Sequence, residues 1–188
     1  MTSTLIEETN ANSISFGTVA DKFTQDGDAE AHNNIGVIYH LQGEVSRAVS
    51  EYEKALNINT GFADAHSNLG VAYYAQGNTE LAIKEFREAL RINPGLAQSH
   101  YNLGVAYKAI GDIYCAVAEF KVAYDLDPDD GATNFSLGQV YQNQGELQKA
   151  LDFYEKYIRV APGDEEQYLE IALEMINRIK KEISLIKT

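Results

Sequence analysis

Residues 63–96, ADAHSNLGVAYYAQGNTELAIKEFREALRINPGL, form one copy of a unit that occurs four times in this chain. The four copies follow one another without gaps, at residues 29–62, 63–96, 97–130 and 131–164. The period is therefore constant at 34 residues. A fixed period of this length indicates a repeated supersecondary unit that buries its apolar faces by stacking on its neighbours.

The residues that keep their place in the unit are small, aromatic or turn-forming. They are Gly36, Gly70, Gly104 and Gly138; Tyr39, Tyr73, Tyr107 and Tyr141; Gly43, Gly77, Gly111 and Gly145; Ala48, Ala82, Ala116 and Ala150; Tyr52, Phe86, Phe120 and Tyr154; and Pro94, Pro128 and Pro162. Most of the 14 glycines are accounted for in this way, which leaves few for a loop that could cradle phosphate groups.

Each unit predicts two antiparallel helices. In the second unit they run over residues 63–76 and 79–92, and Gly77 and Pro94 end them because glycine adopts left-handed turns and proline cannot continue a helix. We expect Gly70 and Ala82 to let the two helices approach closely, with Phe86 filling the space beside them.

This pattern closely resembles the tetratricopeptide repeat (TPR) family over residues 29–164. The resemblance implies an all-α TPR solenoid, a right-handed superhelix of antiparallel helix pairs, with four repeats plus a C-terminal capping helix. The chain departs from the family at the fourth place, where a large aromatic residue is common. Its residues there are His32, His66, His100 and Asn134.

Composition excludes several classes of protein. The net charge of −13 argues against a nucleic-acid binder, which needs a basic surface, and no apolar run is long enough to span a bilayer. The first residues lack the pattern of a signal peptide, and a single cysteine, Cys115, fits a reducing compartment. We therefore expect a cytoplasmic protein with no integral membrane segment.

The two ends of the chain leave alternatives open. Residues 1–28 carry apolar residues at helical spacing (Ile14, Phe16, Val19, Ala20 and Phe23), which predict a short capping helix, although a flexible arm or a partner-binding segment would also fit. Residues 165–188 predict a capping helix with a basic, apolar tail. Over residues 177–188 this tail is an extended cap, a contact for homo-oligomers or a docking helix for a partner.

We find no motif for catalysis, for a cofactor or for a metal. Cys115 is expected to be a small core residue, and the acidic run from Asp125 to Asp130 lacks the spacing of a calcium loop. The three histidines of the fourth place should lie about 8–10 Å from one another, too far apart to share one ion. We interpret them as half-buried packing residues.

The resemblance also implies a binding surface, because in TPR arrays the first helix of each repeat lines a concave groove. The residues carried over to it, taken as the candidate peptide-binding set, are Asn34, Asn68, Asn102, Val37, Val71, Val105, Asn33, Tyr74, Tyr101, Lys108, Phe135, Glu30 and Asp64.

Two rows of this set indicate how a ligand would bind. Asn34, Asn68 and Asn102 form an asparagine ladder similar to that of TPR-containing protein O-glycosyltransferases, and each amide can both donate to and accept from a peptide backbone. Local contacts between helices are the alternative role for these amides. Val37, Val71 and Val105 form an apolar row beside the ladder.

The charges of the set narrow the choice of ligand. TPR co-chaperones that bind a C-terminal carboxylate use basic residues at places where this chain has none, and Lys108 is the only cation in the groove set. Glu30 and Asp64 make the first half acidic.

The sequence therefore predicts a non-catalytic protein–protein interaction scaffold that binds a partner peptide or helix. The alternatives are a self-assembling structural TPR protein and, by family resemblance alone, an assembly factor for a membrane-bound complex of the photosystem type.

Overall fold

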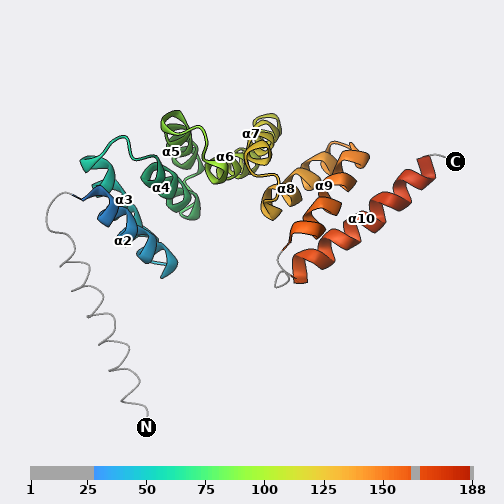
Figure 1. Ribbon diagram of the computed structural model, residues 1–188, viewed down its shortest axis with the longest axis horizontal. Helices are drawn as coiled ribbons and strands as arrows, with labels where there is room; N and C mark the ends of the chain where they lie inside the picture. The colour runs from blue at the N-terminus through green and yellow to red at the C-terminus, as the bar shows by residue number, and fades with distance from the viewer. Residues whose placement is uncertain (1–27, 162–165, 187–188) are drawn as a thin grey trace, which may run out of the picture. The chain divides into compact units, whose positions relative to one another are not determined.

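A computed structural model of the chain describes residues 28–161 and 166–186 (Figure 1). These residues form nine α-helices and no strand. The first helices of the four repeats, here called the A helices, are α2 (Ala29–Leu41), α4 (Ala63–Ala75), α6 (Ala97–Ala109) and α8 (Gly131–Asn143). The second helices, the B helices, are α3 (Val45–Ile58), α5 (Thr79–Ile92), α7 (Ile113–Leu126) and α9 (Leu147–Val160), and α10 (Glu166–Ile186) follows the last repeat.

The predicted helices are confirmed almost to the residue. The A helix of the second repeat ends at Ala75, one residue before the predicted end, and its B helix has the predicted bounds. Gly77 follows Gln76 with φ +79°, a left-handed conformation that glycine adopts without steric cost. The glycines at the same place in the other three repeats share it.

The helices divide into two compact units, one that ends at Ile92 and one that begins at Asn93. In the first unit, α2 packs on α3, α3 on α4, and α4 on α5. In the second unit, α6 packs on α7, α7 on α8, α8 on α9, and α9 on α10. The pairwise packing of successive antiparallel helices is that of a TPR solenoid with a C-terminal helix, as predicted.

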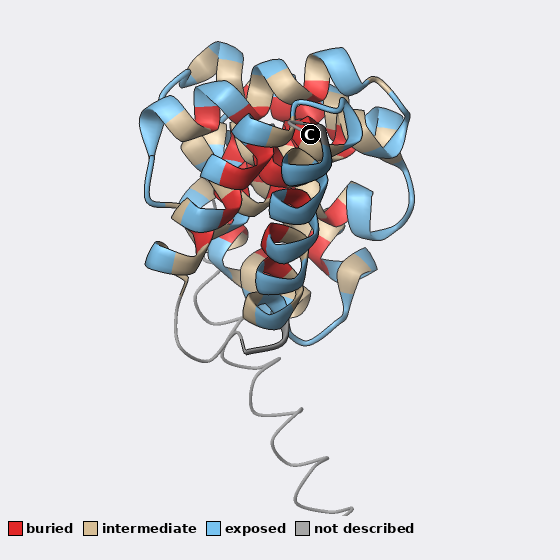
Figure 2. Ribbon diagram, turned by 90° about the vertical axis from the view of Figure 1, so that its right-hand side faces the viewer, coloured by how far each residue is buried: buried red, intermediate tan, exposed pale blue. Residues whose placement is uncertain are grey.

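A glycine of each A helix lies directly against the aromatic ring of its B helix. A Cβ atom placed on Gly70 would lie 2.7 Å from Phe86 Cδ1, and the equivalent atoms on Gly36, Gly104 and Gly138 would meet Tyr52, Phe120 and Tyr154 as closely as 2.5–2.8 Å. All four rings are at most 2% exposed. Figure 2 colours the helices by burial, with buried residues in red. A side chain at this place would clash with the ring, so only glycine fits there.

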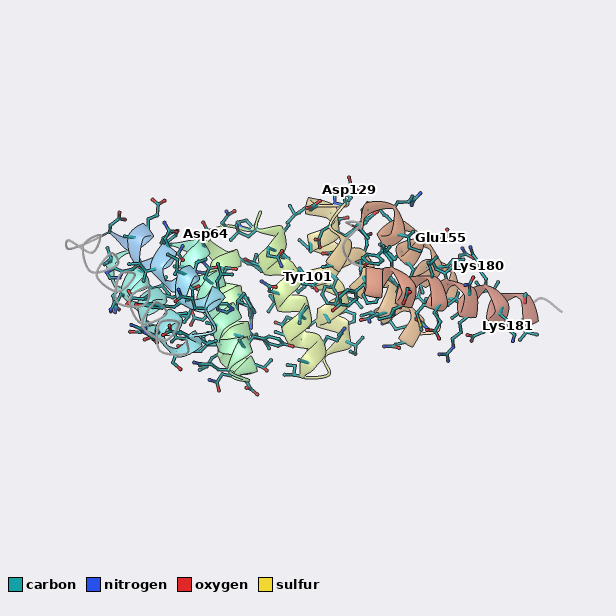
Figure 3. All side chains as sticks on the ribbon, turned by 90° about the horizontal axis from the view of Figure 1, so that it is seen from below. Asp64, Tyr101, Asp129, Glu155, Lys180 and Lys181 are labelled. Carbon is teal, nitrogen blue, oxygen red and sulfur yellow. The ribbon has the colours of Figure 1, made fainter. Side chains whose placement is uncertain are left out.

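Helix α10 uses its apolar stripe within its own chain. Ile179 is completely buried in the cluster that also contains Tyr154 and Tyr157 of α9, and Ile183 packs against the same cluster. Lys180 Nζ lies 2.8 Å from Glu155 of α9 (Figure 3). These contacts support the extended cap among the three interpretations of residues 177–188.

One expectation from the sequence needs correction, and another concerns residues that the structure does not describe. Cys115 is half-buried in the first turn of α7, where its backbone N–H donates to Asp112, so it is not the core residue that we expected; its neighbour Ala116 is. The predicted capping helix of residues 1–28 falls, except for Asp28, outside the described residues.

Candidate functional site

The first unit brings eight residues of the candidate set onto two A helices. Glu30 and Asn34 of α2 and Asp64 of α4 are exposed, and Val37 and Val71 are half-buried. Tyr74 keeps 37% of its surface exposed. This part of the surface thus combines acidic groups, amides and incompletely buried apolar side chains.

The asparagines of this unit are not equivalent. Asn68 Nδ2 donates to Asn33 Oδ1 at 2.9 Å, from α4 to α2, and Asn33 is only 7% exposed. Asn34, by contrast, faces solvent. A local helix contact, the alternative left open for the ladder, is thus present at Asn68.

The second unit holds the other five candidate residues. Lys108 Nζ donates to Gln139 Oε1 at 3.0 Å, from α6 to α8. The ring of Tyr101 lies 5.7 Å from that of Phe120 between centroids. Val105 and Asn102 are half-buried, and Asn102 accepts a hydrogen bond from Gln98.

Phe135 belongs to an aromatic cluster rather than to an open surface. Its centroid lies 5.6 Å from that of Tyr154, 5.2 Å from Tyr157 and 6.0 Å from Tyr168 of α10, all with tilted, edge-on rings. This geometry is favourable for aromatic pairs. The cluster fixes α8, α9 and α10 to one another, and only the remaining surface of Phe135 can meet a ligand.

The histidines of the fourth place are bonded in a way that the sequence analysis missed. His32, His66 and His100 each place Nδ1 2.7 Å from a carboxylate oxygen of the B helix, on Glu51, Glu85 and Glu119. His66 Nε2 also lies 3.2 Å from the carbonyl oxygen of Thr60, and His100 Nε2 lies 3.1 Å from that of Pro94. His66 and His100 thereby each join the A helix, the B helix and the link before the repeat.

The fourth repeat lacks this pair. Asn134 stands in the place of histidine and donates through Nδ2 to the carbonyl oxygens of Pro128 and Asp130, so it keeps only the contact with the link. Phe153 stands in the place of the glutamate. The histidine and the glutamate are thus present together in three repeats and absent together in the fourth, which is the signal that would have revealed the pair.

Replacing Asn68 by alanine should cost more stability than replacing Asn34. The first change leaves the buried Asn33 amide oxygen without its donor, which we expect to cost about 1–2 kcal/mol. Asn34 is exposed, so its change should cost less than about 0.5 kcal/mol. Urea titration of both variants measures the difference, and equal losses would contradict the bond to Asn33.

The first repeat should lose stability in acid through Glu51. Burial alone would raise the pKa of this carboxyl, but hydrogen bonds from Lys54 and His32 outweigh it and lower the pKa below its ordinary value. A carboxyl with a lowered pKa stabilises the fold above its unfolded pKa, and this stabilisation disappears as the pH falls through the folded value.

Thermal melting between about pH 5 and pH 3 tests this expectation. Glu51→Gln should flatten the acid slope of the melting temperature, whereas Glu174→Gln, on the exposed side of α10, should not. Identical slopes in both variants would refute the role of Glu51.

Two further findings concern the described residues. None of their helices has the length and apolar character that crossing a bilayer requires. Among the same residues, no three His, Cys, Asp or Glu side chains gather as metal ligands would.

Comparison with known proteins identifies repeats of one family along most of the chain. A family model described as "TPR repeat" matches residues 38–77 and 72–111. Two models described as "Tetratricopeptide repeat" match residues 97–130 and 132–164. No curated protein sequence matches the chain.

Solved structures share the fold. A structure titled "Crystal structure of MamA" is 24% identical, with a TM-score of 0.64 over 82% of this chain and 98% of that one. A second, titled "Crystal structure of MamA protein", is 25% identical, with a TM-score of 0.67 over 85% and 88%. The structure titled "Functional Characterization of Pseudomonas Aeruginosa pilF" is 22% identical, with a TM-score of 0.67 over 80% and 75%.

The helix pairs, the glycine–aromatic contacts and the matched family models all indicate the same 34-residue repeats. The matched repeats support the role of a protein-interaction scaffold, and the solved structures share its fold. The chain belongs to the tetratricopeptide repeat family.

Proposed function

We propose that this chain is a non-catalytic scaffold that binds an extended segment of a partner protein on its A helices. The observation that carries the proposal is the incomplete burial of Val37 and Val71. Both valines are half-buried at equivalent places of α2 and α4, so each still has apolar surface to give to a ligand.

The polar groups beside these valines suit a peptide. The exposed Asn34 amide can donate to and accept from a peptide backbone. The exposed carboxylates of Glu30 and Asp64 favour a basic residue at that end of the ligand. The C-terminal residues of the set should contribute less to peptide binding. Phe135 already packs against Tyr157, and Lys108 already donates a hydrogen bond to Gln139.

The repeat spacing favours a particular ligand conformation. Successive A helices of a stacked array lie about 8–10 Å apart. A polyproline II strand returns to the same face every three residues, about 9.3 Å, whereas a β-strand returns every two residues, about 6.6 Å. We therefore expect aliphatic residues at three-residue spacing to meet the valine row.

A peptide array tests the proposal. Peptides with one basic end and leucines spaced by two, three or four residues are compared for binding to the full chain. Tightest binding at a spacing of three supports an extended ligand. A preference for positions i, i+4 and i+7 would indicate a helical ligand instead, and no binding by any series would contradict the proposal.

Self-assembly is the second candidate function, and one observation favours it. Leu185 of α10 keeps 67% of its surface exposed although its neighbour Ile183 is packed within the chain. Light scattering of the wild type and of Leu185→Glu separates the two functions. An oligomer that this substitution dissociates would support self-assembly, and a monomer at all concentrations would contradict it.

A further inference from the structure

One face of α2 is less buried than the same face of every later A helix. The face consists of Ala31, Ile35 and Ile38, at helical spacing i, i+4 and i+7. Ala31 and Ile35 are half-buried, and Ile38 is 44% exposed. The nine equivalent residues are all at most 4% exposed: Ala65, Leu69 and Ala72 in α4; Ser99, Leu103 and Ala106 in α6; Thr133, Leu137 and Val140 in α8.

In α4 and α8, the helix that covers this face is the one that directly precedes it in the chain. In the first unit, α3 packs on α4, and its Tyr52 shares a cluster with Leu69 and Ala72. In the second unit, α7 packs on α8, and its Phe120 shares a cluster with Leu137 and Val140. Links of four residues, 59–62 and 127–130, join each covering helix to the covered one.

The chain has a segment of matching character directly before α2. Phe16, Ala20 and Phe23 recur at i, i+4 and i+7, the spacing of the inward residues Ala48, Tyr52 and Ala55 of α3. Five residues, 24–28, separate Phe23 from the start of α2, whereas seven residues, 56–62, separate Ala55 from the start of α4.

We propose that residues 13–23 form a helix whose Phe16–Ala20–Phe23 face packs on Ala31, Ile35 and Ile38 of α2 in the same chain. A second copy of the protein could present an apolar surface to the same face. The tethered segment is favoured over it, because its effective concentration at α2 is about millimolar and because two chains of net charge −13 repel each other.

Hydrogen exchange of the full chain, read by mass spectrometry, tests this contact. In the wild type, amides of residues 13–23 should exchange at least about tenfold more slowly than in an unstructured peptide. Ile38→Ser should abolish this protection. Ile58→Ser is the matched control, since Ile58 of α3 is 45% exposed, and it should change the rates over 13–23 less than about twofold.

A second variant changes the other side of the proposed contact, without altering any residue of the repeats. The double substitution Phe16→Ser with Phe23→Ser lies outside them and should accelerate exchange over residues 29–41. The proposal is overturned if residues 13–23 exchange at the unstructured rate, or if Ile38→Ser leaves their rates unchanged. Protection that disappears on tenfold dilution would also overturn it, because that result assigns the face to a second copy.

Discussion

Gly70→Leu should destabilise the first unit by about 3 kcal/mol or more, since the added side chain enters space that Phe86 already fills. The nearest ring atoms would lie 2.7 Å from the new Cβ, and Phe86, 1% exposed, has no open space into which to turn. The measurement is the free energy of unfolding from urea titration followed by circular dichroism.

Two controls separate overpacking from a general effect of altered glycines. Gly131→Ala should be tolerated, because its Cβ would meet the Tyr157 ring at an ordinary 3.5 Å. Phe86→Leu should partly relieve the damage of Gly70→Ala, with a coupling energy of about 1 kcal/mol. If Gly70→Leu is as stable as the wild type, the close contact between the two helices is wrong.

Ile179→Ala should cost about 3 kcal/mol and loosen α10 from α9. Ile179 is completely buried, and the substitution leaves a cavity in the cluster that also contains Ile176 of the same helix. Unfolding of the full chain and hydrogen exchange over residues 166–186 measure the two effects.

Leu173→Ala is the matched control on the same helix. Leu173 is 49% exposed, so the loss should stay below about 0.5 kcal/mol. Similar losses in both variants would show that α10 does not dock through the stripe that contains Ile179.

Helix bounds and helix pairing were predictable because the sequence repeats its turn residues. Gly77 with positive φ and Pro94 end helices for reasons that act within a few residues. The glycine recurs in all four repeats and the proline in three. The glycine–aromatic contact was predicted only in part. Gly70 was expected to admit the helix backbone with Phe86 beside it, whereas the ring of Phe86 lies directly against the glycine.

Contacts that depend on how neighbouring helices are staggered were not predictable. The bond from Asn68 to Asn33 joins two A helices, and no spacing rule distinguishes it from an amide that faces solvent. The bond of Lys108 to Gln139 is of the same kind. The histidine–glutamate pairs are different, because their joint absence at Asn134 and Phe153 is visible in the sequence itself.

The central claim, that the A helices carry the binding surface, is tested by one matched comparison. Peptides selected for binding to the full chain are titrated against Val71→Asp, on the A helix α4, and Val122→Asp, on the B helix α7, where Val122 is 39% exposed. Circular dichroism confirms that both variants are folded. We predict at least a tenfold loss of affinity for Val71→Asp, about 1.4 kcal/mol, and less than about a twofold loss for Val122→Asp. Unchanged binding by a folded Val71→Asp variant, or an equal loss in both, would contradict the claim.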